Sequence, residues 1–204
     1  MTPTHANTRL EALCDGVFAI AMTLLIIEIK LPDMERIAAA SELWHALQHL
    51  TPAVFAFVLS FGIIFITWVN HHATLRLVSH SSPSFIYANG FLLLTVVAMP
   101  FPTALLGAFL WTDQAAPAVV LYNAVLAAQA VGWILVGGTA LASPLTIDER
   151  STAAMRDSRR NGYFAFALYA MLALTALWFP FAVAMVSAAS WLFWLVLGVR
   201  MKHA

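Results

Sequence analysis

The chain has 204 residues, of which 62% are hydrophobic and only 10% are charged, and its formal net charge is zero. Soluble domains carry roughly a quarter of charged residues, so this composition excludes an ordinary soluble domain and indicates a multi-span membrane protein. The balanced charge gives no indication of nucleic acid as a partner. The single cysteine, Cys14, excludes an internal disulfide and a cysteine-based metal cluster.

The long hydrophobic runs are apolar on all sides, which is typical of membrane-spanning helices. Pro52 suits the first helical turn of the second run, and Pro100 and Pro102 must end or kink the third, because proline lacks an amide donor. Residues 33–50 are polar to amphipathic and are expected to form a loop or an interfacial helix. A charged segment at 148–160 is expected to precede the fifth span. The sequence thus predicts one all-α transmembrane domain over residues 1–204, with six spans at about 9–31, 52–75, 84–110, 115–142, 162–179 and 181–199.

Lysine and arginine are distributed unevenly between the two sides of this topology. Of 10 such residues, only Lys30 and Arg36 fall in the predicted outer segments. Cytoplasmic loops carry the excess of positive charge, so we expect a multi-pass protein of the cell (inner) membrane with both termini in the cytoplasm. The predicted inner cations are Arg9, Arg76, Arg150, Arg156, Arg159, Arg160, Arg200 and Lys202.

The first span separates into two faces when its residues are placed at 100° per residue. Ile20, Leu24 and Ile27 form one apolar stripe, which on pattern alone is more typical of helix packing than of a pore wall. Asp15 projects about 140° away from Ile20 in the same geometry and should point into the bundle of its own subunit. Small residues expected to allow close helix approach beside Asp15 are Ala12, Gly16, Ala19 and Ala21.

Polar side chains gather toward the inner end of the second span. Trp68, His71 and His72 share a face at i, i+3 and i+4, so Trp68 and one histidine are expected to bond Asp15. Such a group fits a structural clamp and a proton relay equally well. Histidines are too few for a metal site, and no phosphate-binding loop or nucleophile elbow is present. We therefore expect no enzyme, no metal and no cofactor.

The first helix opens with Arg9, three residues, and Leu13-Cys14-Asp15, and continues through Ala19-Ile20 and Thr23-Leu24-Leu25. This segment resembles the motif of the transmembrane protein 175 family, the endolysosomal potassium channels and their single-repeat prokaryotic relatives. The family motif is Arg, three residues, Phe-Ser-Asp, and then a helix with Ala-Ile and Thr-Leu-Leu. Leu13 therefore replaces Phe, and Cys14 replaces Ser. Trp68-Val69-Asn70-His71-His72, the six spans and the inside termini also resemble the family.

The resemblance implies a homotetramer in which the first helix of each subunit lines a central pore for potassium ions. It implies a hydrophobic constriction at Ile20, with Leu24 and Ile27 one and two turns outward. It also implies that Thr23 contributes to the preference for potassium over sodium. Glu28 is expected at the outer mouth, where a carboxylate concentrates cations. The structural polar network is expected to contain Arg9, Cys14, Asp15, Trp68, Asn70, His71 and His72.

The expected mechanism is passive, leak-type conduction through a hydrophobic gate, because a narrow apolar ring excludes water and ions and a slightly wider one admits them. Two alternatives stay open. The first is a proton-coupled or cation secondary transporter that uses Asp15 with His71 or His72. The second is a membrane scaffold that transports nothing.

Overall fold

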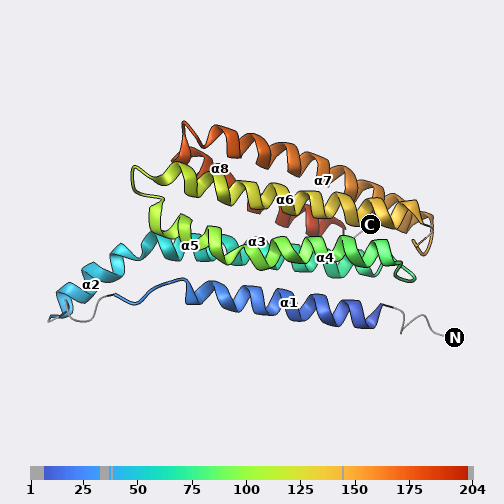
Figure 1. The fold of residues 1–204 in the computed structure, drawn as a ribbon, viewed down its shortest axis with the longest axis horizontal. Helices are drawn as coiled ribbons and strands as arrows, with labels where there is room; N and C mark the ends of the chain where they lie inside the picture. The colour runs from blue at the N-terminus through green and yellow to red at the C-terminus, as the bar shows by residue number, and fades with distance from the viewer. Residues whose placement is uncertain (1–6, 33–36, 38, 144, 202–204) are drawn as a thin grey trace.

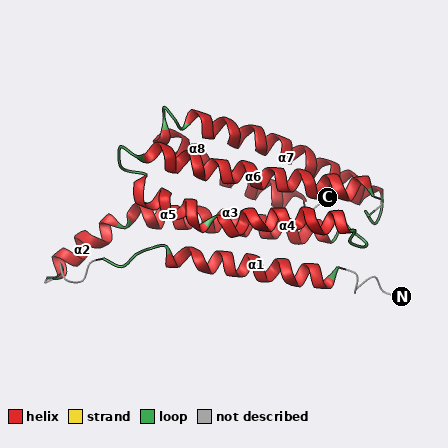
Figure 2. Ribbon diagram, in the orientation of Figure 1, coloured by secondary structure: helices red, strands yellow, loops and turns green. Residues whose placement is uncertain are grey.

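The computed structural model describes residues 7–32, 37, 39–143 and 145–201. Every regular element in those ranges is an α-helix (Figure 2). In chain order the helices are α1 (Thr8–Ile27), α2 (Ala40–His49), α3 (Thr51–Leu75), α4 (Pro83–Ala98), α5 (Pro100–Phe109), α6 (Ala115–Ala142), α7 (Glu149–Thr175) and α8 (Pro180–Met201).

The long helices lie side by side with their axes roughly aligned (Figure 1). α1 lies along one edge of the bundle against α3 and α4, and α7 lies along α6 at the opposite edge. Among the described residues, four segments are long and apolar enough to cross a membrane: α1, α3, α4 together with α5, and α6. The 25 residues of α3 extend about 37 Å at 1.5 Å per residue, which exceeds a hydrocarbon core of about 30 Å.

Proline interrupts the third apolar run where the sequence predicts it. α4 ends at Ala98 and α5 begins at Pro100, while Met99 between them keeps helical backbone angles. The chain therefore kinks instead of turning back, and Pro83–Phe109 remains one candidate span. Pro102 falls in the first turn of α5. Amides in the first turn have no partner within their own helix, so the lack of an amide donor at Pro102 removes no hydrogen bond of α5.

Several predicted boundaries are wrong. α1 ends at Ile27, well before residue 31. The charged segment at 148–160 is part of a helix, because α7 already begins at Glu149 and ends at Thr175. Asp148 caps that helix: its carboxylate accepts a 2.7 Å hydrogen bond from the Ser151 amide, which holds the pKa of Asp148 below its usual range. For residues 33–50 the sequence predicts either a loop or an interfacial helix, and Ala40–His49 form a helix, α2.

Buried hydroxyl groups hold α3, α5 and α6 together. The hydroxyls of Ser60 and Tyr122 lie 3.0 Å apart, and Thr103 donates to Ser60 at 2.7 Å. Ser187 of α8 donates to Asn123 of α6 at 2.9 Å. Lipid tails are as apolar as leucine, so membrane helices associate through such bonds and close packing; each bond contributes about 0.6 kcal/mol on average.

Two connections meet at the end of the bundle where α1 begins. The amide of Ser79 donates to the carbonyl of Leu145 at 2.8 Å, and the amide of Ile147 donates to the carbonyl of Leu77 at 3.1 Å. These bonds form a short antiparallel bridge between the α3–α4 connection and the α6–α7 connection. Main-chain pairing therefore fixes this end of the bundle.

At Gly107, α5 packs closely against α3, since a Cβ atom there would lie 2.8 Å from the Ala53 Cα atom. We expect Gly107→Ala to separate the two helices and to lower the midpoint of thermal unfolding in detergent, at a cost of about 1–3 kcal/mol. Gly90→Ala on α4 is the matched control, because nothing lies within 4 Å of the added atom. Equal midpoints for the two variants would contradict the close contact.

Candidate functional site

One face of α1 is left uncovered by the rest of the subunit. Ile20, Leu24 and Ile27 are 60%, 40% and 61% exposed, and the described helices do not cover them. Thr23 is exposed beside them, and its hydroxyl donates to the carbonyl of Ile20 at 2.9 Å. The four predicted pore residues therefore lie on one accessible, largely apolar face.

The opposite face of α1 packs against the bundle. Its buried residues recur with helical spacing, so α1 contributes a continuous apolar strip to the core. Cys14 of the predicted polar network belongs to this strip and is fully buried. The complete set is Leu10, Cys14, Phe18, Ala21 and Leu25.

A hydrogen bond joins α1 to α3 between these two faces. The indole Nε1 of Trp68 donates to Asp15 Oδ1 at 2.8 Å, as the helical geometry predicts. The indole is held in place by neighbouring rings, because its centroid lies 5.7 Å from Phe65 and 6.1 Å from His72. Asp15 therefore points toward its own subunit.

The two adjacent histidines face different partners, since consecutive helix residues project about 100° apart. His72 Nδ1 lies 3.2 Å from Glu11 Oε1, a pair that is ionic only when the imidazole is protonated. His71 is buried, its Nε2 lies 2.8 Å from Asn89 Oδ1, and its ring packs 5.4 Å from Phe18. His71 thus ties α3 to α4, while His72 ties α3 to α1.

Other predicted site residues lie elsewhere. Arg9 is exposed, and in the described part of the chain its side chain is not joined to Asp15, Trp68 or either histidine. The side chain of Asn70 lines a cavity on the other side of α3. Glu28 lies just beyond α1 and lines a cleft of about 480 Å³ together with Lys30.

The predicted placement of the small residues is wrong for three of the four. Ala12, Gly16 and Ala19 are exposed, and only Ala21 is buried. They lie on the flank of α1 between Asp15 and Ile20, so helix approach on the packed side does not depend on them.

Asn7 is a contact that sequence reasoning missed. Its Nδ2 donates to the carbonyl of Val78 at 2.9 Å, and its Oδ1 accepts from the Ser81 hydroxyl at 2.5 Å. Asparagine just before a helix usually caps that helix. Here the Asn7 side chain makes no capping bond and joins α1 to the α3–α4 connection instead.

Several known proteins that are similar to this chain are named as potassium channels. Residues 9–100 match the family model described as "Endosomal/lysosomal potassium channel TMEM175". A potassium channel of Chamaesiphon minutus is 44% identical over 130 residues, which are 63% of this chain and 64% of that protein. One of Streptomyces collinus is 40% identical over 130 residues, 63% of this chain and 62% of that protein. The matched region thus spans slightly less than two thirds of these relatives.

Solved structures match over nearly the whole chain. The crystal structure of a lysosomal potassium-selective channel TMEM175 homologue from Chamaesiphon minutus is 34% identical, with a TM-score of 0.76 over 92% of this chain and 96% of that one. A variant of the potassium channel MtTMEM175 shares the fold, with 18% identity and a TM-score of 0.64 over 96% of this chain and 91% of that one. These names describe channels and not enzymes, as the sequence predicts.

The bond between Trp68 and Asp15 gives a direct test of how α1 is held. Trp68→Phe removes the donor and leaves the carboxylate without its partner, at a cost of about 1.5–3 kcal/mol for a bond to a charged group. We expect a lower midpoint of thermal unfolding. Trp178→Phe is the control, because Trp178 is 71% exposed. An equal decrease of the unfolding midpoint in both variants would mean that the hydrogen bond does not anchor α1.

Proposed function

This chain belongs to the TMEM175 family, and from that premise we propose that it conducts potassium ions passively across a membrane. The observation that carries the proposal is the uncovered face of α1, with Ile20, Leu24 and Ile27 in a row and Thr23 beside them. The matched relatives are named as potassium channels, which also supports potassium conduction by this chain.

We propose a homotetramer with α1 at its centre. One stripe on one helix can line only one side of an ion pathway, and the described helices of the subunit leave no other apolar wall facing it. Four copies related by a rotation axis would enclose the pathway completely. α1 suits this position because it lies at the edge of the bundle (Figure 1).

The proposed constriction is Ile20, with Leu24 and Ile27 one and two turns further along. An apolar ring at this position gates by dewetting. Thr23 would face permeating ions beside the ring, and Glu28 would raise the cation concentration at the outer mouth. The bonds of Asp15, Trp68, His71 and His72 serve a structural role in this proposal.

We further propose one domain over residues 1–204 that crosses the cell membrane six times, with α7 and α8 as the fifth and sixth crossings. Arg76 and the charged first turns of α7 lie at the end of the bundle where α1 begins, which supports a cytoplasmic position for that end. Arg36 and Lys202 lie outside the described residues. An even number of crossings puts both termini in the cytoplasm.

Potassium flux from proteoliposomes tests the function. A channel gives flux that follows the electrochemical gradient and needs no second ion. Strict coupling to protons would instead support a transporter that uses Asp15 with His71 or His72. Against this, Asp15 bonds to Trp68, His71 bonds to Asn89 and His72 pairs with Glu11. Absence of flux from correctly assembled protein would support a scaffold.

The constriction is tested by a polar substitution. Ile20→Asn should ease wetting of the narrowest ring and raise potassium conductance severalfold, measured in planar bilayers. Ile26→Asn is the matched control, because Ile26 is also exposed (52%) but projects away from the stripe. Unchanged conductance in Ile20→Asn would remove Ile20 from the constriction.

Selectivity is tested at Thr23. Thr23→Val keeps the shape and removes the hydroxyl, so we expect the preference for potassium over sodium, measured from reversal potentials, to fall severalfold. Thr23→Ser keeps the hydroxyl and should retain most of that preference. A preference that is equal in both variants would show that the hydroxyl plays no part in selectivity.

A further inference from the structure

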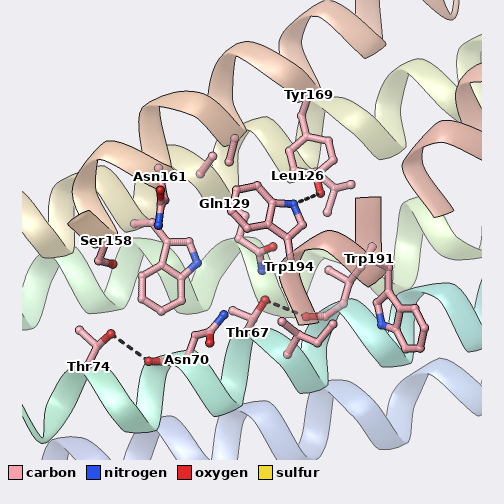
Figure 3. A pocket seen from close by; sticks show the side chains of 16 residues that line it. Thr67, Asn70, Thr74, Leu126, Gln129, Ser158, Asn161, Tyr169, Trp191 and Trp194 are labelled. Carbon is pink, nitrogen blue, oxygen red and sulfur yellow. Dashed lines mark hydrogen bonds between the residues drawn. The ribbon is translucent and has the colours of Figure 1, made fainter. Parts of the chain in front are cut away.

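A cavity of about 100 Å³ lies inside the subunit between α3, α6, α7 and α8 (Figure 3). It lies on the side of α3 that faces away from α1, so it is separate from the proposed pore. Three tryptophans, Trp133, Trp191 and Trp194, contribute to its wall. None of its lining residues carries a formal charge.

The cavity has a polar and an apolar part. Asn70, Ser158 and Asn161 are partly exposed and lie toward the end of the bundle where α7 begins. Leu126 and Tyr169 are buried and lie deeper. A cavity with uncharged polar groups at one end and apolar walls at the other suits an uncharged amphiphile and disfavours an ion.

Four polar side chains of the wall are already paired within the protein. Trp194 Nε1 donates to the hydroxyl of Tyr169 at 2.8 Å. Thr67 donates to the carbonyl of Ile63, and Thr74 donates to the carbonyl of Asn70, both at 2.8 Å. The hydroxyl hydrogens of Thr67 and Thr74 and the indole N–H of Trp194 are therefore used within the protein.

Gln129 differs from these paired groups. Its side chain is only 6% exposed, and its Nε2 atom is buried without a hydrogen-bond partner among the described residues. Its carboxamide points into the middle of the cavity, toward Thr67 and Asn70 (Figure 3). The Nε1 atom of Trp191, which packs over Gly62, is also unpartnered there. Buried N–H donors are nearly always paired in proteins, so Gln129 Nε2 is available to an acceptor that enters this cavity.

We propose that the cavity is a binding site for a small uncharged molecule that has an apolar ring and one hydrogen-bond-accepting oxygen. The oxygen accepts from Gln129 Nε2, and the ring lies between the aromatic side chains. The volume of about 100 Å³ limits the ligand to one six-membered ring at most, because an engineered apolar cavity of about 150 Å³ holds benzene. A cyclic ketone is the simplest member of this class.

The test uses the full-length protein in lipid nanodiscs and saturation-transfer difference NMR. Cyclohexanone should give a saturable signal that empty nanodiscs do not give. Methylcyclohexane has a similar shape and no acceptor, and its affinity should be at least about tenfold lower. Absence of a saturable signal would mean that the cavity holds only water and would overturn the proposal. Equal binding of the two probes would overturn it as well.

Variants locate the site. Gln129→Met keeps the length of the side chain and removes its donor, so cyclohexanone affinity should fall about tenfold. Gln114→Met, an exposed residue just before the same helix, is the matched control and should bind normally. Ala165→Leu fills the cavity and should abolish the signal, which keeps the test decisive if Gln129→Met fails to fold. Undiminished binding in Ala165→Leu would overturn the assignment. Because ligand binding is measured without ion flux, absence of binding is distinguished from absence of the proposed channel function.

Discussion

The hydrogen bond from Trp68 to Asp15 is the interaction on which the arrangement of α1 depends. Hydrophobic burial does not drive one apolar helix onto another in a membrane, because lipid is an equally good environment for both. Specific polar contacts must therefore decide which face of α1 turns inward. Asp15 and Glu11 reach α3, and Asn7 reaches the α3–α4 connection. With those contacts made, the stripe containing Ile20 must face away from the subunit.

Some polar side chains in the interior of the bundle are fully hydrogen-bonded, and others are not. Ser60, Tyr122 and Thr103 satisfy one another across three helices, which specifies how those helices fit together. Gln129 lies in the same interior on α6 without an equivalent partner for its Nε2 atom. Because an unpaired donor is costly in a low-dielectric interior, the contrast marks the cavity as different in kind from the packed core around it.

Much of this fold could be predicted, because hydropathy and proline positions dictate where apolar helices begin and break. The bounds of α6 and the kink at Pro100 were predictable for that reason. The start of α7 was not, since charged residues beside an apolar run suggest a loop although Asp148 supplies a helix cap. Helical geometry predicted the direction of Asp15. Helical geometry could not predict the contact between Asn7 and Val78, because the two residues are distant in sequence and their contact depends on how two loops meet.

The polar contacts of α1 with the rest of the described chain are concentrated in its first half, from Asn7 to Asp15, at the end fixed by the bridge between two loops. Beyond Asp15 the helix meets its neighbours through apolar side chains such as Leu25. The polar contacts therefore hold α1 at one end, and apolar packing alone holds the rest of it. Ile27 lies about 18 Å from Asp15 along the axis, so a tilt of about 5° displaces it by about 1.6 Å but displaces Ile20 by only about 0.7 Å. In the proposed tetramer, a small tilt of α1 would therefore move Ile27 and Leu24 away from the pore axis further than Ile20.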